Sequence, residues 1–113
     1  MKYTGRHTDA FLLLFLMEGD CYGGQLLKKC EDDLPSNPID SAILYRTLRK
    51  LEDEGAIQSY TDVSATDRLK KMYTMTTLGE ERLAVFKEDI EEKMRNLILF
   101  LDTYEERTFK RHD

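Results

Sequence analysis

The stretch that decides the fold is "SAILYRTLRKLEDEG", residues 41–55. Three leucines follow the three- and four-residue spacing of one helix face: Leu44, Leu48 and Leu51. Asp40 or Ser41 can cap such a helix because its side-chain oxygen accepts free N–H groups of the first turn. Gly55 is a typical residue to end it. We therefore expect an amphipathic helix with one face in a core and the other open.

The open face of this helix is basic, although the chain as a whole is acidic, with a net charge of -5. Ala42, Arg46, Arg49 and Lys50 lie opposite the leucines, and Tyr45 lies at the border. An even spread of negative charge argues against a general polyanion binder, whereas a local cluster of cations favours one.

The length of 113 residues fits one domain, or one domain with an extension. Residues 1–9 lack a signal-peptide pattern, and the apolar run 11–17 is far shorter than the roughly 20 residues that a membrane span needs. With only Cys21 and Cys30, we expect a cytoplasmic protein with reduced thiols.

The remaining pattern predicts two helices before this one, at about residues 8–18 and 23–33, and two strands after it, at 56–63 and 70–76. A last helix is expected at about 76–104, with both ends of the chain loose. The predicted fold is thus mainly α with a small two-stranded β-wing. Residues 1–75 would form a winged helix-turn-helix DNA-binding domain, and residues 76–113 a C-terminal dimerisation helix and tail.

The last helix has an apolar stripe with an average spacing of 3.5 residues, which is typical of a coiled-coil seam. The stripe consists of Leu83, Phe86, Ile90, Met94, Leu97, Leu101 and Tyr104. The chain offers no further element to cover the far half of the stripe. We therefore expect a second copy of the helix to cover it, and so a homodimer.

In winged helix-turn-helix modules the second helix of the pair enters the major groove of DNA. Arg46 can grip guanine O6 and N7 with two hydrogen bonds, whereas Arg49 and Lys50 suit phosphates. Arg68, Lys70 and Lys71 form a second basic cluster at the wing. The predicted DNA-binding residues are Ser41, Ala42, Tyr45, Arg46, Arg49, Lys50, Arg68, Lys70 and Lys71. A plain solvated helix face remains the alternative, favoured slightly by the acidic residues 52–54.

Three segments resemble the PadR family of bacterial transcriptional regulators: "YGGQLLKKCEDDL" (22–34), "LYRTLRKLEDEGAI" (44–57) and "RLKKMYTMTTLGEERL" (68–83). The resemblance covers nearly the whole chain and is closest to the short subgroup with one C-terminal helix. It implies a homodimeric repressor that binds a near-palindromic operator in double-stranded DNA. The positions carried over most directly are Tyr45, Arg46, Arg68 and Lys71.

The chain also departs from the family pattern. Ala42 and Ile43 replace a usual Gly-Thr pair, so one hydroxyl that would serve a phosphate is absent. Gly24 stands where a second aromatic residue is common. Asp67 and Leu69 replace the usual Gly and Pro of the wing. The fold should tolerate these changes.

The resemblance further implies release from DNA by a small aromatic or cationic effector. Phe86, Met94, Phe100 and Tyr104 are the candidates for its pocket, although residues at this helical spacing also suit a plain core. Neither catalytic motifs nor metal-like spacing of Cys21 and Cys30 appears, so we expect no enzyme, no metal and no cofactor. The alternative function is a protein-interaction module that kept the winged-helix dimer but does not bind DNA strongly.

Overall fold

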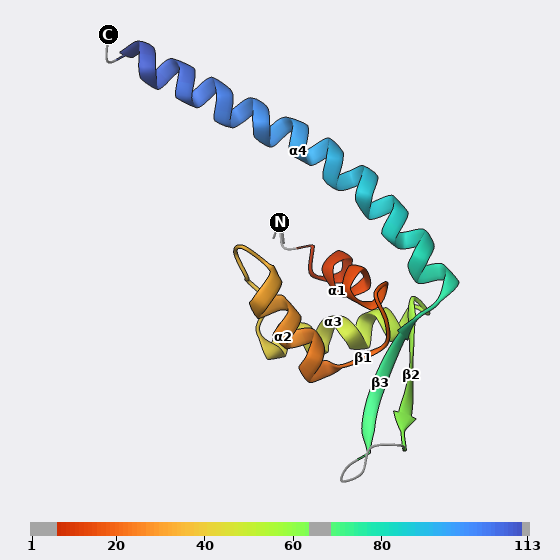
Figure 1. The fold of residues 1–113 in the computed structure, drawn as a ribbon. Helices are drawn as coiled ribbons and strands as arrows, with labels where there is room; N and C mark the ends of the chain where they lie inside the picture. Colours follow the sequence, from red (N-terminus) through yellow and green to blue (C-terminus); the bar gives the residue numbers. More distant parts are fainter. Residues whose placement is uncertain (1–6, 64–68, 112–113) are drawn as a thin grey trace. The chain divides into compact units, whose positions relative to one another are not determined.

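The computed structural model describes residues 7–63 and 69–111 (Figure 1). The elements in chain order are α1 (Thr8–Leu16), β1 (Cys21–Tyr22), α2 (Gly23–Asp33), α3 (Ser41–Asp53), β2 (Ile57–Asp62), β3 (Lys70–Met75) and α4 (Thr77–Arg111). This confirms the predicted order of three helices, a ribbon and a last helix. The chain divides into two compact units, Met1–Leu83, here called the head, and Ala84–Asp113, here called the distal segment. The functional boundary placed at residue 75 stays a prediction.

The core of the head is built from leucines of the first three helices. The largest side chains less than 2 % exposed are Leu12, Leu13, Leu26, Cys30, Leu44, Leu48, Leu51 and Ile57. The predicted stripe of α3 is therefore confirmed. Five of the nine residues of α1 are buried, whereas Leu14 is 43 % exposed and Met17, directly after the helix, is 57 % exposed.

The ends of α2 and α3 follow local signals. α2 has the predicted bounds, and its first residue follows Tyr22, whose backbone N–H donates to Gln25 Oε1 at 2.9 Å. Asp40 caps α3 by accepting a hydrogen bond from the Ile43 N–H at 2.8 Å. Gly55 follows the helix with φ +83°, a conformation that favours glycine.

α1 begins at Thr8, as predicted. His7, with φ 48° and ψ 39°, occupies the N-cap position. Asp9 is already helical, and its Oδ1 accepts from the Ala10 N–H at 3.0 Å. The helix ends at Leu16 before a turn that contains Gly19 at φ +152°.

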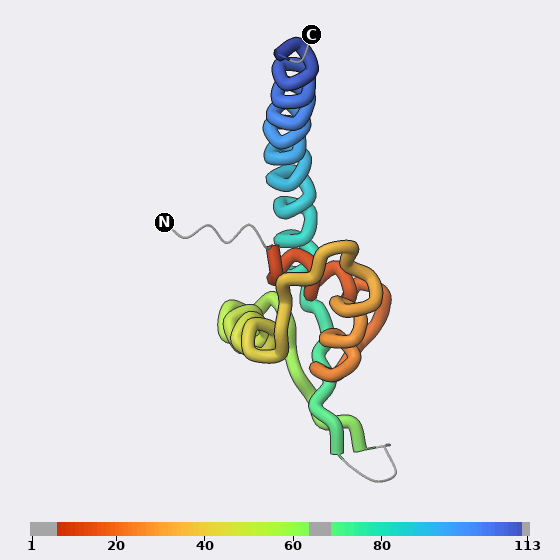
Figure 2. Tube along the Cα trace, turned by 90° about the vertical axis from the view of Figure 1, so that its left-hand side faces the viewer, coloured from red at the N-terminus to blue at the C-terminus, as the bar shows by residue number. Residues whose placement is uncertain are grey.

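The sheet has three strands where two were predicted. All pairs are antiparallel in the order β1-β3-β2, with Cys21 opposite Tyr73 and Ser59 opposite Tyr73 on the other side. β1 is only two residues long, so no alternation could reveal it. In two perpendicular views the β2–β3 ribbon, here called the wing, projects beyond the helices of the head (Figures 1 and 2).

α4 begins in the head and is longer than predicted. Thr76 caps it: the Gly79 N–H donates to Thr76 Oγ1 at 3.2 Å. The helix continues to Arg111, so the expectation of a loose C-terminal end is wrong as far as Arg111. The Thr108 hydroxyl donates to the Tyr104 carbonyl at 2.6 Å, and Lys110 pairs with Glu106 at 3.8 Å. Basic side chains in the last turn also suit the negative end of the helix dipole.

Candidate nucleic-acid interface

α3 presents all six of its predicted DNA-binding residues to solvent: Ser41, Ala42, Tyr45, Arg46, Arg49 and Lys50. The leucines that fix the helix to the core lie on the other side. The amphipathic helix predicted for residues 41–55 is therefore confirmed, and the exposed face of α3 is accessible to a partner.

The cations on α3 differ in what they contact. In residues 7–63 and 69–111, no carboxylate forms an ion pair with Arg46 or Arg49. Lys50 Nζ lies 3.7 Å from Asp9 Oδ2 on α1. Among the described residues, the two arginines thus have no carboxylate partner to give up, whereas Lys50 also helps to join α3 to α1.

Tyr45 lies against the first residue of α2. A Cβ atom added to Gly23 would lie 2.5 Å from both Cε1 and Oη of Tyr45, so any other residue at this position would displace the end of the Tyr45 side chain. The Tyr45 side chain still remains 46 % exposed. Gly23 therefore sets the position of an exposed aromatic residue on α3, a role that sequence reasoning missed because the two residues are distant in the chain.

The wing brings further cations next to aromatic rings. Lys70 Nζ lies 4.0 Å from the centroid of the Tyr22 ring, and Lys71 Nζ lies 5.5 Å from that of Tyr73. A cation over an aromatic face is attracted by the ring quadrupole. Arg68, the third cation predicted for the wing, lies outside the described residues, as does Asp67.

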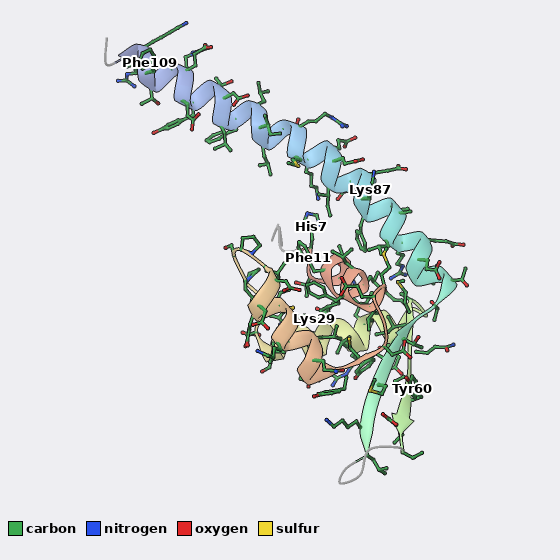
Figure 3. All side chains as sticks on the ribbon, in the orientation of Figure 1. His7, Phe11, Lys29, Tyr60, Lys87 and Phe109 are labelled. Atoms are coloured by element: carbon green, nitrogen blue, oxygen red, sulfur yellow. The ribbon has the colours of Figure 1, made fainter. Side chains whose placement is uncertain are left out.

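A hydrogen bond joins the wing to the segment before β1. The Tyr60 hydroxyl on β2 (Figure 3) donates to Asp20 Oδ2 at 2.7 Å. This bond to the carboxylate raises the pKa of Tyr60. The wing is therefore tied to the rest of the head by side chains as well as by its pairing with β1.

Two of the three acidic residues that follow the α3 cations are engaged inside the head. Glu52 accepts from the Ser59 hydroxyl and lies 3.8 Å from Lys71 Nζ. Glu54 pairs with Arg82 of α4, and this hydrogen bond lowers the pKa of Glu54. Their charges are thus partly compensated, which weakens the argument that they would repel DNA.

The predicted dimerisation stripe of α4 divides by exposure. Leu83, Phe86 and Ile90 are partly buried. The exposed fractions of the remaining members are 56 % for Met94, 64 % for Leu97, 56 % for Leu101 and 60 % for Tyr104. The far half of the stripe is thus apolar and uncovered in a single chain.

The four candidate effector residues share this exposure in part. Phe100 and Tyr104 stack with ring centroids 6.2 Å apart, and Phe100 is 65 % exposed. A pocket formed with Phe86 and Met94 stays a prediction. Elsewhere, burial raises the pKa of the Cys21 and Cys30 thiols, which disfavours reactive thiolates.

No group of three His, Cys, Asp or Glu side chains in the described part of the chain is placed to hold a metal ion. In the same residues, no helix is both long enough and apolar enough for a membrane span.

Known proteins share both the sequence pattern and the fold. The family model for the transcriptional regulator PadR-like family matches residues 12–85. A PadR family transcription regulator from Clostridium difficile R20291 is 23 % identical, with a TM-score of 0.75 over 84 % of this chain and 98 % of that one. A transcriptional regulator from Clostridium thermocellum is 24 % identical, with a TM-score of 0.71 over 86 % and 95 %.

A third structure was solved with DNA. Bacillus subtilis PadR in complex with operator DNA is 29 % identical, with a TM-score of 0.65 over 72 % of this chain and 46 % of that one. The matched family model covers the α3 helix and the wing, where the candidate interface lies. Its members are transcription regulators and not enzymes, as the sequence predicted. The chain therefore belongs to the PadR-like family of transcriptional regulators and has the DNA-binding winged-helix fold.

Proposed function

We propose that the chain is a cytoplasmic homodimeric repressor that binds a near-palindromic operator and is released by a small aromatic or cationic effector. The observation that carries the DNA-binding part is the exposed face of α3, where Arg46 and Arg49 have no carboxylate partner among the described residues. Unpaired guanidinium groups on a helix fixed by buried leucines are a ready site for base edges and phosphates.

The residues have different roles in this proposal. Arg46 reads a guanine through two hydrogen bonds, and Arg49 binds a phosphate. Ser41, Ala42 and Tyr45 contact the groove beside them. Lys50, Lys70, Lys71 and Arg68 supply further phosphate contacts. Operator DNA bound to the related Bacillus subtilis PadR supports this assignment.

The uncovered apolar side chains of α4 support the homodimer. Two-fold symmetric dimers place two recognition helices in successive major grooves, about 34 Å apart, and so favour near-palindromic sites. The effector would bind beside Phe86, Met94, Phe100 and Tyr104, where aromatic and methionine side chains suit a flat or cationic compound. Binding there would release DNA if it changed the spacing of the two recognition helices.

Fluorescence anisotropy with DNA from the upstream region of the gene, at two salt concentrations, tests the proposal. Arg46→Ala should weaken binding to the operator by about 1 to 3 kcal/mol and reduce the preference over unrelated DNA. Lys71→Ala should weaken all sequences alike and lower the salt slope by about one. Lys110→Ala removes a cation at the far end of α4 and serves as the control. If neither Arg46→Ala nor Lys71→Ala changed DNA binding, the assignment of these residues to the DNA interface would be refuted.

The second candidate function is the protein-interaction module. The observation that favours it is the pairing of Lys50 with Asp9 and of Lys71 with Glu52, which leaves fewer free cations than the sequence indicates. Affinity for DNA should then be absent or insensitive to salt, because few phosphate contacts would release counterions. The same titration therefore separates the two candidates.

A further inference from the structure

Glu52 connects α3 to both long strands of the wing. Its Oε2 accepts a hydrogen bond from the Ser59 hydroxyl on β2, and its Oε1 lies 3.8 Å from Lys71 Nζ on β3. The Glu52 side chain is 34 % exposed. The carboxylate is therefore held in one place by Ser59, with one oxygen directed at the Lys71 ammonium.

Lys71 is held loosely. Its side chain is 59 % exposed, and its ammonium contacts Glu52 on one side and the Tyr73 ring, 5.5 Å away, on another. An exposed ion pair of this length contributes little, because water screens it and both side chains lose freedom. A phosphate oxygen at the DNA surface can therefore replace Glu52 as the partner of Lys71 at small cost.

Unlike Lys71, Glu52 has a partner that would keep it in place when DNA binds. The bond from Ser59 keeps the carboxylate beside the wing even after the ammonium has moved. A fixed negative charge would then lie near the phosphate that Lys71 contacts. Like charges at such a distance repel, and the repulsion acts on any DNA because phosphates carry no sequence information.

We propose that Glu52 is a positioning residue that holds Lys71 in the free protein and competes with DNA phosphate for its ammonium. This inference rests on the proposed DNA-binding function. Glu52 lowers the sequence-independent part of the affinity and leaves base reading by Arg46 unchanged. It thereby weakens binding to the operator and to unrelated DNA by the same factor.

Glu52→Gln tests the proposal because glutamine keeps an oxygen for the Ser59 hydroxyl but has no charge. We expect binding up to about fivefold tighter, the upper range for one exposed ion pair. The gain should be equal for promoter DNA and for a random duplex. The slope of affinity against salt should become steeper, by up to about one unit. Glu52→Ala should give a gain in the same direction, and thermal unfolding checks that both variants are folded.

Two further variants separate the proposed coupling from a general charge effect. Asp53→Asn makes the same change of charge on the neighbouring exposed residue and should leave the affinity within about twofold, as expected for a screened surface charge. In a Lys71→Ala background, Glu52→Gln should produce a clearly smaller gain, because the ammonium that it releases is absent and only the direct repulsion of phosphate is removed. A gain of the same size without Lys71, or an equal gain from Asp53→Asn, would overturn the proposal.

DNA binding by the unmodified protein shows whether the role of Glu52 or the proposed function itself has failed. If it binds DNA and Glu52→Gln binds equally well, the role of Glu52 is wrong and the proposed function stands. If neither protein binds any DNA, the proposed function and the role of Glu52 both fall.

Discussion

α1 and the middle of the distal segment have similar sequences but opposite surroundings. α1 contains "FLLLFL" at residues 11–16, and α4 contains "LILFL" at residues 97–101. In α1, Leu12 and Leu13 are fully buried. In α4, Leu97, Leu99 and Phe100 are each about 65 % exposed. Apolar composition alone therefore does not decide which helix lies in a core.

The difference lies in what the chain supplies as cover. α1 contacts α2, α3 and β3 of the same head. Among residues 84–111, none is buried. Five consecutive apolar residues on a helix point to all sides, because successive residues are about 100° apart. Such a segment exposes more apolar surface than a monomer usually tolerates, which favours cover by another protein surface.

The largest effect is predicted for a substitution in the buried helix α1. Leu12→Ala leaves a cavity in the core and should lower the free energy of unfolding by about 2 to 5 kcal/mol. Urea unfolding followed by circular dichroism, at equal protein concentrations, measures it. Leu14→Ala in the same helix is the matched control, since Leu14 is 43 % exposed, and should cost about 1 kcal/mol or less. Equal losses would mean that α1 is not packed as described.

For the exposed apolar segment of α4, the prediction concerns the stability of a dimer. If a second chain covers Leu97, Leu97→Ala removes apolar contact from both protomers and should weaken the dimer by about 2 to 3 kcal/mol. Sedimentation equilibrium measures the dissociation constant. Asn96→Ala, at the neighbouring exposed position, should change it little. A mass of one chain for the unmodified protein at micromolar concentration would contradict the homodimer.

Local signals explain which parts of the head were predictable. The ends of α3 depend on Asp40 and Gly55, which act within a few residues, and its leucine stripe is visible in the sequence. β1 depends on pairing of Cys21 with Tyr73, a contact that no local pattern encodes. The same limit applies to Gly23, whose importance appears only once Tyr45 is folded against it.

The candidate site was predictable to a similar extent. The exposed face of α3 follows from helical spacing, so its six residues could be assigned from the sequence. The partners of its cations could not, because Asp9 reaches Lys50 only through the packing of α1 on α3. Likewise, Glu52 comes near Lys71 only when β3 has paired with β2.

The first residues of α4, unlike those of the distal segment, belong to the head, and they pack against its other residues. A Cβ atom on Gly79 would lie 2.3 Å from the Ala56 carbonyl oxygen and 2.6 Å from Met75 Cγ. Gly79→Ala should therefore destabilise the head by about 1 to 3 kcal/mol, although alanine normally favours a helix. Thermal unfolding measures the change. Gly24→Ala is the control in α2, where the new atom meets only the edge of the Tyr22 ring at 3.0 Å, and it should have a smaller effect.

The smallest predicted effect compares one ion pair in the head with one in the distal segment. Arg82 lowers the pKa of Glu54, and Lys87 lowers that of Glu91. A carboxylate whose pKa is lower in the folded state stabilises it above the unfolded pKa of about 4.3, and this contribution is lost as pH falls through the folded pKa. Glu54→Gln should lower the midpoint of thermal unfolding of the head at pH 7.

The difference between Glu54→Gln and the unmodified protein should then shrink as the pH is lowered from about 5 to about 3, because protonation removes the same charge. Glu91→Gln should leave the unfolding of the head unchanged at every pH, since Lys87 and Glu91 join one turn of the distal segment to the next. A Glu54→Gln difference that does not vary with pH would show that its effect comes from packing and not from the charge of the pair with Arg82.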